Sequence, residues 1–472
     1  MAGITDWPWR YWAARKPQTF ALTVEAQAWS WQRLASHCEA LAADFSRQGV
    51  NPDDIVALRG KNSATMLFSY LALLQCGARV LPLNPQLPAS LLSTLLPSLG
   101  VAHWLSVAPP DDDAPVFCNP LHYPDSVTVT TPAERPLPEW QASRLATLTL
   151  TSGSSGLPKA AVHAFSAHIA SAQGVIELMA FTAQDSWLLS LPLFHVSGQG
   201  IVWRWLTAGA RLVLRSAQPL EHALQDCSYA SLVPTQLWRL LAQGTLPDSL
   251  SAVLLGGAAI PLELTQQAEA RGIRCWCGYG MTEMASTVCA KRADGQAGVG
   301  LPLLAREIDV QEGEILLRGD SMAAGYWRDG TLLPLTDSDG WFHTRDSGVF
   351  QHNEWHVLGR LDNQFFSGGE GIQPENIEAL LLAHPKVQQA CVVPVTDAEF
   401  GQRPVAVIDV SPDVTLAAIR DWLTPQLAGF QRPVAYYAMP ADLHGGGIKI
   451  ARVQVQAWAE KIYRNGVEQR AV

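Results

Sequence analysis

LTLTSGSSGLPK, residues 148–159, is the stretch of this 472-residue chain that decides its fold. A β-type run enters a loop of small hydroxyl residues and glycines, which ends in Lys159. Glycines let backbone N–H groups converge on phosphate oxygens, hydroxyls add donors and the lysine adds charge. The spacing is not that of a Walker A loop, and Pro158 with the β-like residues 160–163 disfavours a helix opening directly off the loop. The stretch therefore indicates a phosphate-binding loop, with a plain Ser/Gly turn as the alternative.

Helices and strands alternate on the N-terminal side of this loop. Residues 33–48 and 62–76 have the pattern of helices that end at glycines, and residues 55–58 and 79–83 have that of short strands. Such alternation predicts α/β layers with largely parallel sheets. Residues 107–139, rich in Pro and Asp, indicate an irregular surface stretch.

The pattern changes after Gly298. Short strands at 314–318 and 355–358, broken by Gly and Asp, predict a small β-rich subdomain. From Asp362 onward, helices near 374–384 and 415–427 suit a compact α+β unit.

Composition excludes several classes of protein. Hydrophobic residues make up 48% of the chain and charged residues 16%, which is a globular composition. The net charge of -10 gives no overall attraction to nucleic acid or anionic lipid. The most apolar long stretch, 187–206, contains Pro192, His195 and Arg204, which a lipid-spanning helix would hardly tolerate. We expect a soluble, cytoplasmic protein whose eight cysteines are reduced and structural.

Further motifs accompany the phosphate loop in a fixed order. They lie at LPLFH 191–195, GGAAIP 256–261, GYGMTE 278–283, TRD 344–346, GRLD 359–362, SGGEGI 367–372 and GIK 447–449. Together they resemble the motifs of the adenylate-forming superfamily of acyl-CoA synthetases, peptide-synthetase adenylation domains and luciferases. The resemblance covers nearly the whole chain.

Longer segments narrow the resemblance to the o-succinylbenzoate–CoA ligases of menaquinone (vitamin K2) biosynthesis, particularly the enterobacterial ones. These segments are DWPWR 6–10, LLQCGARVLP 73–82, FHVSGQGI 194–201, VPTQLWR 233–239 and FFSGGEGIQP 365–374. The resemblance implies ATP-dependent ligation of 2-succinylbenzoate to coenzyme A (CoA) through an acyl adenylate, with AMP and diphosphate as by-products. It implies ATP, Mg²⁺ and CoA as cofactors and co-substrates.

The implied fold has a large N-terminal region, residues 1–361, of two α/β lobes plus a β subdomain. A small mobile α+β domain, residues 362–472, follows it and turns between two poses about the hinge Asp362. One pose brings the catalytic Lys449 to ATP. The other brings the CoA-side loop with Ser367, Gly368 and Gly369 to the site. Such a reorientation completes a site in two different ways.

The resemblance assigns ATP binding to Thr151, Ser152, Gly153, Ser154, Ser155, Gly156, Lys159, Gly257, Ala258, Tyr279, Gly280, Thr282, Asp346 and Arg360. Glu283, following a glycine-rich turn, and Thr151 are the expected metal ligands, because a hard carboxylate can hold Mg²⁺ together with phosphate oxygens. Tyr279 offers a flat face for adenine, and Asp346 can accept both ribose hydroxyls. The superfamily's usual Thr-Gly-Asp reads Thr-Arg-Asp here, so Arg345 puts the local turn in doubt.

The catalytic set is Lys449, Glu283 and His195. Lysine in the glycine-rich segment 445–450 supplies a mobile point charge for the α-phosphate and the attacking carboxylate. His195 stands in an apolar stretch, where a structural histidine is the usual alternative. Gly198 and Gly200 favour a pocket wall instead.

The acyl pocket is expected to include His195, Ser197, Gln199, Gly200, Arg204, Ser231 and Thr235. o-Succinylbenzoate carries a second, aryl carboxylate, and an unpaired charge in an apolar pocket is expensive. If the segment is helical from about Gly198, Gly200 and Arg204 lie one turn apart, and the guanidinium can reach over the glycine. Alternatively, Arg204 caps or pairs on a buried helix.

Two other functions stay open. One is another aryl- or acyl-CoA ligase or a standalone aryl-adenylating enzyme. The other is a non-catalytic nucleotide-binding or luciferase-like relative, against which Lys449, Glu283 and the phosphate loop count. The expected partners are small-molecule substrates, without nucleic acid or membrane insertion, and a homo-oligomer stays open.

Overall fold

The computed structural model describes residues 3–107, 115–125, 127, 136–151, 158–215, 219–257, 260–368, 370–397, 399–443 and 451–468. Some predicted site residues lie outside this set. They are Ser152, Gly153, Ser154, Ser155, Gly156, Ala258, Gly369 and Lys449.

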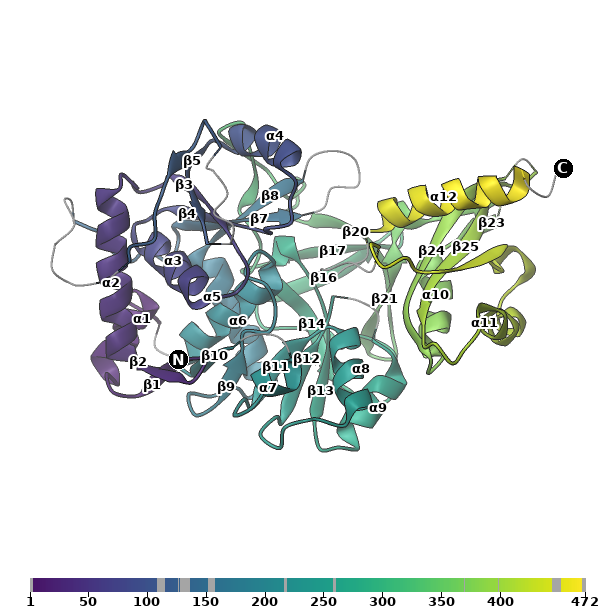
Figure 1. The fold of residues 1–472 in the computed structure, drawn as a ribbon, viewed down its shortest axis with the longest axis horizontal. Helices are drawn as coiled ribbons and strands as arrows, with labels where there is room; N and C mark the ends of the chain where they lie inside the picture. The colour runs from purple at the N-terminus through teal and green to yellow at the C-terminus, as the bar shows by residue number, and fades with distance from the viewer. Residues whose placement is uncertain are drawn as a thin grey trace.

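Two large sheets form the N-terminal region (Figure 1). The nine-stranded sheet runs, in spatial order, β15 (Leu301–Pro302), β14 (Ser286–Arg292), β13 (Arg274–Met281), β12 (Ala252–Leu255), β11 (Tyr229–Leu232), β9 (Ser186–Leu188), β10 (Arg211–Leu214), β1 (Phe20–Val24) and β2 (Gln27–Ser30). The eight-stranded sheet runs β19 (Thr331–Leu333), β18 (Gly325–Arg328), β8 (Lys159–Ala164), β7 (Leu145–Thr151), β4 (Arg79–Leu83), β3 (Ile55–Arg59), β5 (Val101–Ser106) and β6 (Asn119–Pro120). Both have parallel centres, as the alternating pattern predicts. Both edges of the nine-stranded sheet are antiparallel, whereas the eight-stranded sheet is antiparallel at its β19 edge and parallel at its β6 edge.

Helices connect and cover these strands. They are α1 (Pro8–Arg15), α2 (Trp31–Arg47), α3 (Ala64–Gln75), α4 (Ala89–Leu99), α5 (Phe165–Met179), α6 (Val196–Ala208), α7 (Leu220–Ala223), α8 (Pro234–Gln243) and α9 (Leu262–Glu269). Side-chain caps fix two of the starts: Ser30 accepts from the Arg33 backbone N–H at 3.2 Å, and Ser63 accepts from that of Met66 at 3.1 Å. Because of these caps, α2 begins two residues before the predicted position and α3 two residues after it.

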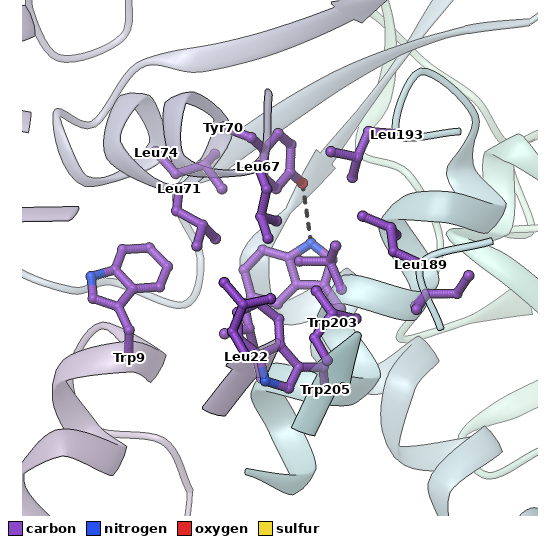
Figure 2. Close-up of a cluster of buried hydrophobic side chains, with 14 of the residues drawn as sticks. Trp9, Leu22, Leu67, Tyr70, Leu71, Leu74, Leu189, Leu193, Trp203 and Trp205 are labelled. Carbon is purple, nitrogen blue, oxygen red and sulfur yellow. Dashed lines mark hydrogen bonds between the residues drawn. The ribbon is translucent and has the colours of Figure 1, made fainter. Parts of the chain in front are cut away.

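Large indole rings pack among leucines in the core between the layers (Figure 2). Trp9, Trp203 and Trp205 are fully buried together with Leu22 and Tyr70. The Tyr70 hydroxyl accepts a hydrogen bond from Trp203 Nε1 at 3.3 Å. This core joins α1, α3 and α6, and so fixes the helix whose N-cap residue is His195.

A four-stranded antiparallel sheet of β16 (Arg306–Gln311), β17 (Glu314–Gly319), β20 (Phe342–Gln351) and β21 (Glu354–Arg360) forms the predicted β subdomain. The single-turn helix η2 (Leu361–Asn363) follows it and contains the predicted boundary at 361/362.

The C-terminal part extends away from the rest of the molecule (Figure 1). It contains β22 (Phe365–Ser367), β23 (Glu370–Ile372), β24 (Val387–Asp397), β25 (Gly401–Val410), β26 (Ala435–Ala438), α10 (Pro374–Ala383), α11 (Leu416–Leu423) and α12 (Arg452–Glu468). The helix α11 is shorter than the predicted 415–427, because Pro425 breaks the pattern and a 3₁₀ turn follows at Thr424–Gln426. Among the described residues, no helix is long and apolar enough to cross a membrane.

Candidate active site

The predicted phosphate loop connects two paired strands. In the register of β7 with β8, Thr151 lies opposite Lys159, and residues 152–157 between them lie outside the described set. Lys159 is exposed, and its Nζ lies 4.8 Å from the centroid of the Tyr326 ring. A strand hairpin with no helix directly after the loop agrees with the prediction from Pro158.

Glu283 lies in the short 3₁₀ turn η1 (Thr282–Met284) and is only 8% exposed. The Tyr326 hydroxyl donates to Glu283 Oε1 at 2.7 Å. Burial, with the nearby Glu283 carboxylate, raises the pKa of Tyr326, so this hydroxyl keeps its proton and remains a donor. Glu283 Oε2 accepts no hydrogen bond from the described residues.

The expected glycine-rich turn before Glu283 is wrong. Gly278 and Gly280 belong to strand β13, which pairs with β14. A Cβ on Gly280 would lie 2.0 Å from the Ser286 carbonyl oxygen, so this glycine is explained by the close approach of two strands. Gly257, by contrast, is exposed with φ of 83°, a left-handed conformation that suits glycine in the adenine-side loop.

Tyr279, Asp346 and Arg360 form one hydrogen-bonded cluster. The Tyr279 hydroxyl donates to Asp346 Oδ2 at 2.5 Å, and Arg360 Nη1 donates to Asp346 Oδ1 at 3.1 Å. Burial and the Asp346 charge raise the pKa of Tyr279. The cluster gathers three residues predicted at the nucleotide, and the Tyr279–Asp346 link was not foreseen.

The backbone conformation of Arg345 is left-handed, as expected where the superfamily has glycine. Its φ is 62°, the left-handed region in which the superfamily's glycine is free of strain. Its backbone N–H donates to Glu314 Oε1 at 2.8 Å, and the Asp346 N–H donates to Thr344 Oγ1 at 2.9 Å. The predicted turn is therefore a bulge within strand β20, with arginine at the left-handed position and hydrogen bonds on both sides.

Arg360 also forms an ion pair with Asp362, the predicted hinge residue. Its Nε and Nη2 donate to the two Asp362 carboxylate oxygens, both at 3.0 Å, a bidentate pair. Burial alone would raise the pKa of Asp362, but the hydrogen bonds and charge of Arg360 hold it below its usual value. One guanidinium thus joins Asp346 and Tyr279 of the hydrogen-bonded cluster to the start of the C-terminal part.

Arg204 lies on α6 with its guanidinium buried. Nη1 donates to Ser231 Oγ at 3.1 Å, and the guanidinium carbon lies 4.7 Å from the Trp187 ring centroid. A Cβ on Gly200 would lie 2.9 Å from Arg204 Nη2, so the guanidinium does reach over the glycine. Burial lowers the pKa of Arg204 to about 9, and within the described ranges no carboxylate pairs with it.

The other predicted pocket residues differ in their placement. His195 is the N-cap residue of α6, where Ser197 also lies half-buried in the first turn. Gln199 is fully buried and donates from Nε2 to Thr149 Oγ1 at 3.0 Å and to the Leu193 carbonyl at 3.1 Å. Thr235 is half-buried in the first turn of α8. Gln199 therefore ties α6 to β7, and only its Oε1 is left for a ligand.

On the predicted CoA side, Ser367 is buried at the end of β22 and Gly368 has φ of 58°. The Gly368 N–H donates to the Phe400 carbonyl at 2.9 Å. Phe366 is 59% exposed beside them, and a single exposed apolar side chain of this kind is ordinary at a protein surface.

Sequence reasoning missed Tyr326 and Trp187, which contact Glu283, Lys159 and Arg204. Tyr326 lies in GYW 325–327, whose Gly-aromatic pattern marks a strand but no chemistry. Trp187 belongs to an apolar run in which an aromatic residue signals core. Only the fold shows that their rings reach predicted site residues.

Comparison with known proteins agrees with this geometry. The family model described as AMP-binding enzyme matches residues 9–327, and that of the AMP-binding enzyme C-terminal domain matches residues 376–444. The 2-succinylbenzoate–CoA ligase of Salmonella typhimurium is 54% identical over 455 residues, which are 96% of this chain and 98% of the relative.

Solved structures of similar proteins have the same fold over their whole length. A variant of E. coli MenE with bound OSB-AMS is 49% identical, with a TM-score of 0.90 over 97% of this chain and 99% of the other. The o-succinylbenzoate CoA synthetase (MenE) of Bacillus subtilis in complex with the acyl-adenylate intermediate OSB-AMP is 26% identical, with a TM-score of 0.85 over 95% and 98%.

Proposed function

Because the chain belongs to the family of AMP-binding enzymes, we propose that it ligates 2-succinylbenzoate to CoA through an acyl adenylate. The products are succinylbenzoyl-CoA, AMP and diphosphate. This makes it an AMP-forming acid–thiol ligase of menaquinone biosynthesis.

In the first half-reaction a carboxylate oxygen of the succinyl chain attacks the α-phosphorus of ATP, and the bond to the β-phosphate oxygen breaks to release diphosphate. Positioning and charge neutralisation supply most of the rate of such a transfer. We assign the phosphate oxygens to the 151–159 loop with Lys159, the ribose hydroxyls to Asp346, and the adenine to the Tyr279 side of the cluster. Lys449, outside the described residues, is assigned to the α-phosphate.

A magnesium ion fits the Glu283 corner. This buried carboxylate keeps one oxygen for a ligand, and Mg²⁺ prefers one or two carboxylates plus substrate phosphates to an all-protein cage. No group of three or more His, Cys, Asp or Glu in the described part of the chain could hold a metal by itself. When bound, the ion would neutralise phosphate charge, with Glu283 and Thr151 as its protein ligands.

In the second half-reaction the CoA sulfur, as the thiolate, attacks the acyl carbonyl carbon. The bond from that carbon to the AMP oxygen breaks, and AMP leaves. We assign the approach of CoA to the loop with Ser367, Gly368 and Gly369, after the C-terminal domain has turned about Asp362. The Arg360–Asp362 pair is the contact that such a turn would have to rearrange.

The observation that most directly supports this acid is the buried Arg204. A buried guanidinium that has no acidic partner among the described residues favours binding of an anion, and the aryl carboxylate of 2-succinylbenzoate supplies one. Benzoate or a fatty acid has no second carboxylate to place there.

A CoA-ligation assay with a panel of acids tests the proposal. We expect 2-succinylbenzoate to give a CoA thioester with kcat/KM at least about tenfold above benzoate, salicylate and octanoate, because one charge-assisted pair is worth roughly 1.5–3 kcal/mol. Equal rates with benzoate would support a general aryl-CoA ligase instead.

A further inference from the structure

The side chain of Tyr326 contacts both Glu283 and Lys159. In the proposed function, these two oppositely charged residues bind the magnesium ion and the phosphates of ATP. The hydroxyl of Tyr326 donates to Glu283 Oε1 at 2.7 Å, and the Lys159 ammonium lies 4.8 Å from the centroid of the same ring. In the described structure Lys159 and Glu283 form no ion pair with each other.

Backbone hydrogen bonds fix the ring relative to both neighbours. Tyr326 pairs with Ala161 in the register of β18 with β8, two residues from Lys159. Just before this strand, the Ala323 N–H donates to the Glu283 carbonyl at 2.8 Å. The position of the ring is therefore set by the sheet and by η1 together.

The Tyr326 hydroxyl supplies a hydrogen-bond donor to the buried Glu283 carboxylate. A carboxylate largely removed from water requires a donor, and this bond occupies Oε1 while leaving Oε2 open. It also selects one rotamer of a flexible side chain, whose ordering would otherwise have to occur on binding.

The face of the Tyr326 ring attracts the Lys159 ammonium. A cation is attracted to an aromatic face without giving up its N–H donors, so all three remain for phosphate oxygens. Opposite charges a few ångströms apart attract strongly near a protein interior. If the ring did not contact both of them, Lys159 and Glu283 could pair and neutralise the two groups that the nucleotide needs.

We propose that Tyr326 is a positioning residue for adenylation, which holds the Glu283 carboxylate in its magnesium-binding orientation and keeps Lys159 apart from it. The inference rests on the proposed function, since that function assigns Glu283 to the metal and Lys159 to the phosphates. It adds a residue that makes no contact with the reacting atoms.

Calorimetric binding of ATP with and without Mg²⁺ tests this, alongside AMP as a ligand without the triphosphate. Tyr326→Phe keeps the ring and removes the donor. We expect ATP affinity to fall about tenfold with Mg²⁺ and less than twofold without it. Tyr326→Leu also removes the ring, and we expect ATP affinity without Mg²⁺ to fall several-fold as well. AMP affinity stays within twofold in both variants.

Tyr70→Phe is the matched control, because it loses the hydroxyl of a buried, hydrogen-bonded tyrosine in the core. It should leave all three affinities unchanged. The inference is overturned if Tyr326→Phe binds ATP with Mg²⁺ as wild type does, or if its affinity falls equally with and without the metal. If Tyr326→Leu fails to fold, Tyr326→Phe decides alone.

The result is separable from the proposed function. If wild-type protein forms no thioester with 2-succinylbenzoate but Tyr326→Phe shows the magnesium-dependent loss, the substrate assignment fails and the role of Tyr326 stands. If ligation proceeds and the loss is absent, the reverse holds.

Discussion

At the scale of single residues, two buried arginines allow a comparison between a charge that we propose for substrate binding and one with a structural role. Arg204 has Ser231 Oγ and the Trp187 ring as neighbours, and Gly200 leaves space beside it. Arg306 is equally buried, but Nη1 and Nη2 donate to the carbonyls of Leu304 at 2.8 Å and Ser171 at 3.1 Å. Only Arg204 lies among the predicted acyl-pocket residues.

Arg204→Lys tests that difference. A lysine keeps the charge and loses the planar fork, so we expect KM for 2-succinylbenzoate to rise roughly 10–100-fold, the equivalent of about 1.5–3 kcal/mol. The KM values for ATP and CoA should stay near wild type in steady-state assays. Arg306→Lys is the control, with lower thermal stability and unchanged KM. If Arg204→Ala binds the acid as wild type does, the carboxylate contact lies elsewhere.

Sequence patterns located Arg204 because helical spacing alone places it one turn from Gly200. They could not locate Tyr326, because its contacts with Lys159 and Glu283 depend on the pairing of β18 with β8, which is remote in sequence. The expected turn at Gly280 was wrong for the same reason, since its strand partner β14 was not visible in a glycine pattern, and its assignment to ATP stays a prediction.

At the scale of elements, the bulge in β20 just before Asp346 carries an arginine where glycine is the family's usual residue. Arg345 adopts φ of 62° while its backbone donates to Glu314. A non-glycine residue in this region costs roughly 1–2 kcal/mol, partly offset because glycine is more flexible when unfolded.

Arg345→Gly should therefore raise the free energy of unfolding by about 0.5–1 kcal/mol in chemical denaturation. The rate of adenylation should stay within twofold of wild type, because the bulge in β20 and the position of Asp346 are kept. Asn353→Gly, at φ of 63° in the β20–β21 turn, is the control, and its gain should be smaller because asparagine tolerates this conformation. A loss of stability in Arg345→Gly would show that the arginine side chain itself stabilises the bulge in β20.

The hinge is the second prediction at this scale. Asp362→Pro fixes φ at a position that has to change its dihedrals, so we expect one half-reaction to fall at least tenfold while the other stays near wild type. Asp362→Ala removes the pair with Arg360 but leaves the backbone free. Its loss of rate in either half-reaction should therefore be smaller than the tenfold loss expected for Asp362→Pro. Normal rates for Asp362→Pro in both half-reactions would remove the hinge assignment.

At the scale of the whole molecule, the predicted layers agree with the structure because alternating periodicity and capping residues are local signals. The two sheets, the β subdomain and the small C-terminal part all follow from them. The order of strands does not, since β9 lies between β10 and β11 through long-range pairing. The boundary at 361/362 and the two poses of the C-terminal domain stay predictions.

Lys449→Ala separates the two poses functionally. We expect acyl-adenylate formation to fall at least a thousandfold, because one charge serves the α-phosphate in that pose alone. Thioester formation from supplied adenylate and CoA should stay within a few-fold of wild type in rapid-quench assays. Equal losses in both half-reactions would contradict a lysine used in only one pose.

Acyl-adenylate formation itself is tested most directly by isotope exchange between diphosphate and ATP in the absence of CoA. The account predicts exchange that requires 2-succinylbenzoate and Mg²⁺, followed on addition of CoA by one AMP for each thioester formed. Exchange that depends on CoA, or release of ADP and phosphate in place of AMP and diphosphate, would contradict an acyl adenylate as the intermediate.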